Sequence, residues 1–472
     1  MALDTVPVEI SDLILDNLAL QDIRRLRLVC HHLNTIASRR TMKALEFCLC
    51  KADFDMLRSI ANSDYAENVT SLKYNSGMLS SKRLNFTTHS EWLQRGFGPK
   101  GWTPAQVDET PLTDAELHRY FDLYDRMCDE QRDILDRNTD YEALEAVISK
   151  LGKLDEVFVW SGWDGRDDFD RANWSFERRG VVEQEVSMGG VDYGDGNARH
   201  LRALIRGVHN AGIKLRAIRA VGMHHSFFDP ERFSLADMTH LFENLTVFEM
   251  EVSAFADWDV GHHNNQQEVL ILLPHVVDGS QCRTMMQKGV LLTALRHMPN
   301  LVSLTLKIRS IIRNWTLVNG TCDPPSLEDT IPLDHSWPKL ESLVLEGMYA
   351  DQAQLANLIL GHKDTLNLLS LEGIRILNGS LVDLLPQLKA GLVGRNVSVE
   401  LGWSLEDSSN IGVPQVVKKH WVKREYREGH PDPVRDYFRD PEITELPLDG
   451  RHRGRPGSWS DSDDDMGFGL FD

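Results

Sequence analysis

The stretch Leu340-Glu341-Ser342-Leu343-Val344-Leu345 decides the fold, because its leucines at the first, fourth and sixth positions mark a spacing that recurs along the chain. Alternation of apolar and polar residues over so short a span predicts a strand that buries one face. The same spacing, kept or with apolar substitutes, occurs at 69–74, 154–159, 245–250, 301–306 and 366–371, and more weakly at 213–217 and 397–401. The chain therefore predicts a series of similar short strands.

A helix-like segment precedes most of these strands. Apolar residues recur at helical spacing within 201–208, 291–295 and 355–359, and a glycine or proline follows each segment. A unit of helix, turn and short strand that buries its leucines only against neighbouring units is typical of a solenoid. We call the six-residue pattern with apolar residues at positions one, four and six the recurring phrase. It resembles the L-x-x-L-x-L pattern of leucine-rich repeats. The resemblance implies an irregular leucine-rich-repeat-like α/β solenoid whose strands line a concave face.

The spacing of the repeats leaves a second interpretation open. It is 39 residues from Leu301 to Leu340 but 26 from Leu340 to Leu366, whereas a regular array repeats every ~20–29 residues. No Asn follows the last leucine of the phrase. An α/β domain whose buried parallel strands happen to be rich in leucine fits the same pattern.

The first 45 residues predict a separate small module of three helices. Ile10, Ile14 and Leu18 recur at helical spacing after Pro7, which suits the first turn of a helix. A second helix is expected from about Gln21, followed by a third short turn. Helices this short bury little apolar surface by themselves, so a partner or the following domain has to complete their core.

This stretch resembles an F-box, the helical module by which a protein binds the adaptor subunit of a cullin–RING ubiquitin ligase. A Trp often stands in that family where Leu33 stands here, and a plain helical cap on the larger domain is the alternative interpretation. The resemblance rests on Pro7, Glu9, Ile10, Ile14, Leu15, Leu18, Asp22, Leu26, Leu28, Val29, Cys30 and Leu33. It implies that the adaptor-binding residues are Pro7, Ile10, Ile14, Leu15, Leu18, Leu26, Val29, Cys30 and Leu33.

Together the two resemblances are to fungal F-box proteins with divergent leucine-rich repeats. They imply a substrate-recognition subunit of an SCF-type ubiquitin ligase, with no catalytic residue and no cofactor of its own. Its partners would be the adaptor, a cullin through the adaptor, and an unknown substrate protein. Two alternatives remain: an F-box interaction protein that acts without a ligase, and an unrecognised enzyme.

The expected organisation follows from these assignments. Residues 1–45 form the docking module, and 46–440 form the substrate-binding α/β domain, with inserted helices and a loop at about 112–197. Residues 450–472 form an acidic tail whose composition predicts disorder. The loop at 160–197, rich in Gly, Asp and Trp, either binds a partner or is fastened to the domain by its aromatic residues.

If the strands line a concave face, the residues that alternate with the buried leucines face the substrate. The expected substrate-binding residues are Glu156, Phe158, Trp160, Glu249, Glu251, Thr305, Lys307, Glu346 and Glu372. This set is acidic on balance. It predicts that the bound segment of the substrate carries Lys or Arg.

Composition narrows the class of protein. The net charge of −20 over 472 residues argues against a nucleic-acid-binding surface, which needs a basic patch. Six sparse cysteines predict no disulfide framework, and Cys48-Leu49-Cys50 lacks the second cysteine pair of a zinc site. No signal peptide or membrane-spanning run is found, so a cytoplasmic or nuclear location without membrane contact is expected. No phosphate-binding or hydrolase motif occurs.

One basic cluster interrupts the acidic composition. Arg199, Arg202 and Arg206 share one side of a helical wheel, opposite Leu204 and Val208. This arrangement predicts a solvated helix surface, and a phosphate- or acid-binding patch is the alternative.

Overall fold

The computed structural model describes residues 10, 13–15, 17–18, 20–79, 114–160, 186–187, 197–232, 235–253, 279–309, 324–402, 404–408, 417–422, 433–444 and 446–449. The expected tail at 450–472, Pro7, and all of the 160–197 loop except 160, 186–187 and 197 lie outside these residues.

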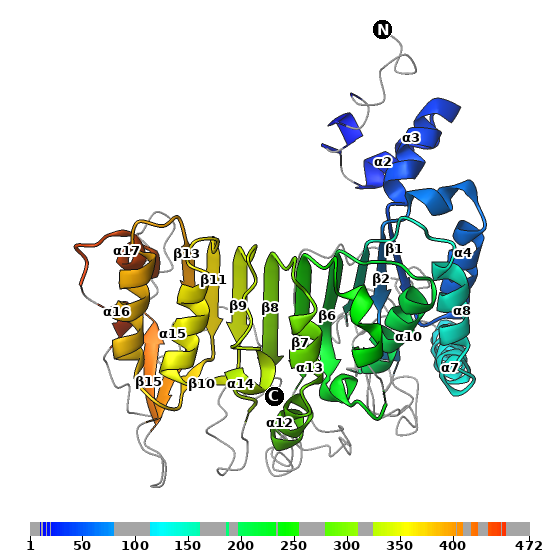
Figure 1. Ribbon diagram of the computed structural model, residues 1–472. Helices are drawn as coiled ribbons and strands as arrows, with labels where there is room; N and C mark the ends of the chain where they lie inside the picture. Colours follow the sequence, from blue (N-terminus) through cyan, green and yellow to red (C-terminus); the bar gives the residue numbers. More distant parts are fainter. Residues whose placement is uncertain are drawn as a thin grey trace.

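The main feature of the fold is one parallel sheet whose strand order follows the chain (Figure 1). Adjacent parallel strands are connected by right-handed crossovers almost without exception, so a sheet that grows in one direction keeps its helices on one face. The chain is therefore α/β, as the sequence predicts. The nine strands are β1 (Ala44–Cys48), β2 (Ser71–Asn75), β4 (Glu156–Trp160), β6 (Ala217–His224), β7 (Val247–Ser253), β8 (Ser303–Arg309), β9 (Ser342–Glu346), β11 (Leu368–Glu372) and β13 (Ser398–Leu401).

Helices precede or connect these strands. In Figure 1 the longer helices of the central and C-terminal units lie in front of the sheet. The helices are α2 (Leu20–Leu26), α3 (His31–Thr41), α4 (Lys51–Ala61), α7 (Asp114–Asp136), α8 (Thr139–Ile148), α10 (Asn197–Asn210), α12 (Gly279–Gln287), α13 (Val290–Arg296), α14 (Leu327–Thr330), α15 (Gln352–Gly361), α16 (Leu381–Leu392) and α17 (Pro433–Arg439), with 3-10 turns η2 (Asp64–Asn68), η5 (His225–Phe228) and η6 (Leu235–Leu241).

Two rows of buried side chains cross the whole sheet and form its core. Each row follows the pairing register from β1 to β13, and each of its side chains is at most 5% exposed. The first row is Leu45, Leu72, Val157, Ile218, Phe248, Leu304, Leu343, Leu369 and Val399, and the second is Phe47, Tyr74, Val159, Ala220, Met250, Leu306, Leu345, Leu371 and Leu401. The fourth and sixth positions of the recurring phrase supply these rows.

The structure differs from the expected strands at two places. Strand β1 falls at the boundary assigned between the helical module and the larger domain, and only two residues separate it from the end of α3. The weak candidate at 213–217 is displaced: the strand begins at Ala217, and Ile218 and Ala220 occupy the buried rows. Leu215 takes the first position of the phrase, and it too is fully buried.

A second, smaller sheet lies beside the C-terminal units. Its strands are β10 (Tyr349–Ala350), β12 (Arg375–Ile376), β14 (Ser404–Ser408), β15 (Val417–Val422) and β16 (Leu448–Asp449), in that order, and a separate pair joins β3 (Met78–Leu79) to β5 (Val186–Ser187). A glycine directly follows β9, β11 and β13. Gly347 has φ +74°, and a Cβ there would lie 1.9 Å from the Ile308 carbonyl oxygen. Only glycine fits this turn between the two sheets.

Residues 112–197, expected to hold inserted helices, contribute to the main fold. Helix α8 packs closely on α10, since a Cβ on Gly207 would lie 2.8 Å from Ile148 Cδ1. Lys150, just after α8, hydrogen-bonds to Asn62 at the end of α4. Helix α8 is therefore part of the helical layer, and β4 is a central strand.

The last unit is covered by α17. Val434, Tyr437 and Phe438 of this helix are buried. Lys389 of α16 donates to the carbonyl oxygens of Asp440 and Ile443, and its ammonium lies 4.5 Å from the centre of the Tyr437 ring.

Candidate interaction surfaces

The N-terminal helices form a small core of their own. Leu15, Ile23, Ile36 and Ala37 are buried together, apart from the main core, with Leu18 and Leu26 partly buried against them. Helix α3 then passes through Met42 and Lys43 directly into β1. Figure 1 shows α2 and α3 projecting above the upper ends of the strands, next to β1.

Large apolar side chains are exposed on this module. Ile10, Leu13, Ile14, Leu28 and Val29 are between 44% and 87% exposed, and we call them the exposed apolar set. Among the described residues the only other exposed large apolar side chains are Val382 and Val393, at 44% and 38%. Ile10, Leu13 and Ile14 have the spacing of one helix face, and Leu28 and Val29 lie in the turn before α3. Apolar surface concentrated in this way is typical of an interaction site.

The expected adaptor-binding residues divide into three groups. Ile10, Ile14, Val29 and Cys30 are exposed, and Leu18 and Leu26 are half-buried. Leu15 is buried in the core of the module, where its side chain helps to hold the helices together, and Leu33 of α3 is buried as well, so neither side chain is available to a partner. A helical wheel could have distinguished Leu15 from the exposed residues, because a separation of five residues turns its side chain about 140° away from that of Ile10. Leu13 and Leu28 are exposed as well.

The second surface is the face of the sheet opposite the two buried rows. The register aligns the expected substrate-binding residues along it: Glu249 pairs with Thr305, and Glu251, Lys307, Glu346 and Glu372 continue across four strands. Sequence alternation therefore placed these positions on one face.

Three expected residues on this face are covered. Phe158 and Trp160 are 4% and 1% exposed and cluster with Val221, and Glu251 is also buried. These three side chains are not available to bind a substrate. Glu156, Glu249, Thr305, Lys307 and Glu346 are half-buried, and Glu372 is exposed.

Ion pairs offset part of the negative charge in the middle of this face. Arg219 of β6 lies with Nε 3.1 Å from Glu156 Oε1 and Nη1 3.4 Å from Glu249 Oε2. Lys307 Nζ lies 3.6 Å from Glu346 Oε2. Arg219 was not predicted on this face, because the expected strand at 213–217 ends before it.

Uncompensated charge remains at the C-terminal end of the same face. Glu372 of β11 and Glu400 of β13 are exposed, and neither forms an ion pair within the described part of the chain. We call Glu372 and Glu400 the acidic end of the face. A cation would meet less competition there than at Glu249 or Glu346.

No protein-family model matches this chain, and no curated protein sequence matches it significantly. Among the described helices, none is both long and apolar enough to cross a bilayer.

Proposed function

We propose that this protein is the substrate-recognition subunit of an SCF-type cullin–RING ubiquitin ligase. The exposed apolar set carries the proposal, since five of the seven exposed large apolar side chains among the described residues lie within 10–29. Burying a large apolar side chain is worth ~1.5–3 kcal/mol. An isolated domain gains nothing from leaving several such side chains in water. A docking module gains binding free energy when a partner buries them.

The geometry of the remaining chain supports a receptor rather than a plain cap. A solenoid of leucine-rich-repeat type has parallel strands in chain order, helices on one face, and a free strand face on the other. The two continuous buried rows fit that description. The short connection from α3 to β1 would hold the strand face at a fixed position relative to a docked adaptor. Tethering would then raise the effective concentration of substrate near the ubiquitin-charged enzyme.

The substrate side of the proposal rests on the acidic end of the face. A segment carrying Lys or Arg would meet Glu372 and Glu400 without displacing an existing ion pair of the described residues. At Glu249 the same segment would have to compete with Arg219. We place the contact with a basic substrate segment at β11 and β13.

The proposal is tested by affinity purification of wild type beside Ile14→Asp/Val29→Asp, which changes two exposed side chains. Loss of the adaptor and the cullin, with other partners retained, is the expected result. The matched control is Val382→Asp/Val393→Asp, which adds the same charge to the other two exposed valines. Wild type that recovers no adaptor rejects the proposal, and adaptor without cullin supports the interaction protein that acts without a ligase.

A further inference from the structure

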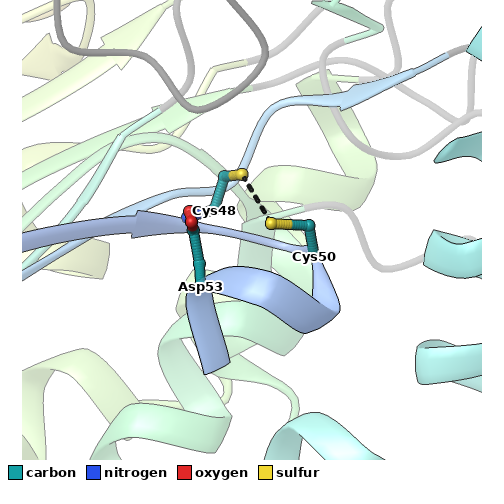
Figure 2. A group of neighbouring side chains, drawn as sticks. All are labelled: Cys48, Cys50 and Asp53. Carbon is teal, nitrogen blue, oxygen red and sulfur yellow. Dashed lines mark hydrogen bonds between the residues drawn. The ribbon is translucent and has the colours of Figure 1, made fainter. Parts of the chain in front are cut away.

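A tight turn at the end of β1 brings two cysteines together. The Cys50 N–H donates to the Cys48 carbonyl oxygen at 2.8 Å, so the chain reverses over Leu49. The two sulfur atoms are 3.6 Å apart. Figure 2 shows the thiols facing one another across the turn from β1 into α4.

Asp53 adds a third ligand atom from the first turn of α4. Its Oδ2 accepts a hydrogen bond from the Cys48 N–H at 2.9 Å, which fixes the carboxylate beside the turn. One of its oxygens lies within 4.8 Å of both sulfur atoms. All three side chains are buried, with exposures of 2%, 2% and 7%.

The separations match the needs of a thiophilic cation. Zn–S bonds of about 2.3 Å at a tetrahedral angle put two sulfurs about 3.8 Å apart, close to the 3.6 Å between Cys48 and Cys50. The corresponding sulfur–oxygen separation is about 3.6 Å, so binding draws the Asp53 carboxylate inward by up to about 1 Å. We propose that Cys48, Cys50 and Asp53 bind Zn²⁺. This site is independent of the proposed ligase function.

Tyr74 lies on β2, beside the strand that carries Cys48. Its ring is fully buried and stacks on Phe47, with ring centres 4.5 Å apart. Its hydroxyl has no hydrogen-bond partner in the described part of the chain. Burial raises the pKa of Tyr74, negative charge on Asp140 raises that pKa further, and Arg199 lowers it. A buried hydroxyl without a partner is explained by a ligand or water beside it.

No zinc site is expected from the sequence, because Cys48 and Cys50 have no second cysteine pair. The structure replaces that pair with a carboxylate from the adjoining helix. Burial holds the pKa of Cys48 well above its usual value while the thiol has no cation. A bound cation reverses this preference by displacing the thiol proton of each cysteine to solvent, and the start of α4 favours the resulting negative charge.

The test measures metal in the full chain, purified under reducing conditions, loaded with Zn²⁺ and desalted. We expect one zinc per chain in wild type, and loss of that zinc in Cys48→Ser/Cys50→Ser. Asp53→Asn keeps an acceptor for the Cys48 N–H and should weaken zinc binding by about tenfold or more. Cys282→Ser is the matched control, because Cys282 is an equally buried thiol on α12. It should keep its zinc.

A second measurement needs no variant. Cd²⁺ titrated into wild type should produce a thiolate-to-metal charge-transfer absorption that saturates at one ion per chain. Wild type that keeps no zinc and shows no such absorption overturns the proposal. Retention of the zinc by a folded Cys48→Ser/Cys50→Ser variant overturns it too, as does a Cys48–Cys50 disulfide that resists reduction in the folded chain.

Discussion

Asp140 of α8 forms a buried ion pair with Arg199 of α10. Arg199 Nη2 lies 2.9 Å from Asp140 Oδ1, and its Nε lies 3.3 Å from Oδ2. The Asp140 side chain is fully buried, whereas 21% of the Arg199 side chain is exposed. The same guanidinium donates to the Leu135 carbonyl and lies 5.0 Å from the centre of the Tyr141 ring. This pair ties two neighbouring helices of the helical layer together.

Arg199→Met should destabilise the fold in a pH-dependent way. Removing one partner of a buried ion pair costs about 3–5 kcal/mol at neutral pH. Burial raises the pKa of Asp140, and the positive charge of Arg199 offsets part of that rise. The pKa of Asp140 therefore rises further when Arg199 is replaced. A raised pKa means that the folded state prefers the protonated carboxyl, and stability present at acidic pH is lost as the pH rises through that pKa.

The free energy of unfolding, measured with urea at about pH 4.5 and pH 8, checks this expectation. The deficit of Arg199→Met relative to wild type should be smaller at the acidic pH. Arg206→Met is the control, because Arg206 is exposed on the same helix, 5.7 Å from the centre of the Tyr141 ring. It should cost less than about 1 kcal/mol at both values. A deficit for Arg199→Met that does not change with pH would contradict the assignment.

The strands of the main sheet could be predicted because their signal is local. In Leu301–Leu306 or Leu340–Leu345, the buried and open positions alternate within six residues, and the structure confirms that alternation. The class of fold follows from repeating such a unit. The position predicted for strand β6 was wrong, because Ala217 and Ala220 carry too little apolar surface to make the recurring phrase recognisable there.

The helix that carries Arg199 and Arg202 shows where sequence patterns fail. A helical wheel predicts a solvated face, yet Arg202 is buried with its guanidinium on the Ser226 carbonyl, and Arg199 meets Asp140. These partners lie 24 and 59 residues away in the chain. No local pattern reports contacts of that range. Arg206 is exposed, as the wheel predicts.

The candidate interaction surfaces could be predicted only in part, for the same reason. Apolar spacing found the N-terminal module but could not divide its residues between its own core and a partner. Alternation placed Glu249 and Glu346 on one face but could not show that Arg219 and Lys307 pair with them. Tertiary contacts decide both questions.

Leu15→Ala should separate the core of the module from its exposed apolar set. Truncating a buried leucine costs about 2–5 kcal/mol, and Leu15 is buried with Ile23 and Ile36. Amide hydrogen exchange in α2 and α3 should accelerate. Val29→Ala changes an exposed side chain and should leave this exchange unaltered. Equal effects of the two substitutions would show that the module has no core of its own.

Gly347→Ala should destabilise the fold by more than the strain of a left-handed residue alone. That strain is worth roughly 1–2 kcal/mol, and the added Cβ would also lie 1.9 Å from the Ile308 carbonyl oxygen. Gly394→Ala is the matched control, since Gly394 has φ +79° and nothing within 4 Å of the Cβ position. Urea unfolding should give a clearly larger loss at Gly347. Equal losses would mean that the close approach of β9 to β8 relaxes without cost.

Glu372→Lys/Glu400→Lys should weaken the binding of a lysine-rich peptide without lowering the stability of the fold. Both carboxylates are exposed and lack ion pairs within the described residues, so reversing them breaks no ion pair among those residues. Exposed charge pairs are worth ~0.2–1 kcal/mol each, so losing two of them predicts a loss in affinity of about twofold to thirtyfold, reduced by added salt. Fluorescence anisotropy with a labelled peptide measures it.

The control for this reversal has to match its change in net charge. Glu67→Lys/Glu142→Lys reverses two exposed carboxylates on η2 and α8, away from the strand face. It should reduce peptide affinity less than the change at β11 and β13. Equal losses from both variants would show that the peptide responds to overall charge, and the acidic end of the face would then have no special role. Glu249→Lys is a poorer test, because it places a second cation beside Arg219 and disturbs the pair already there.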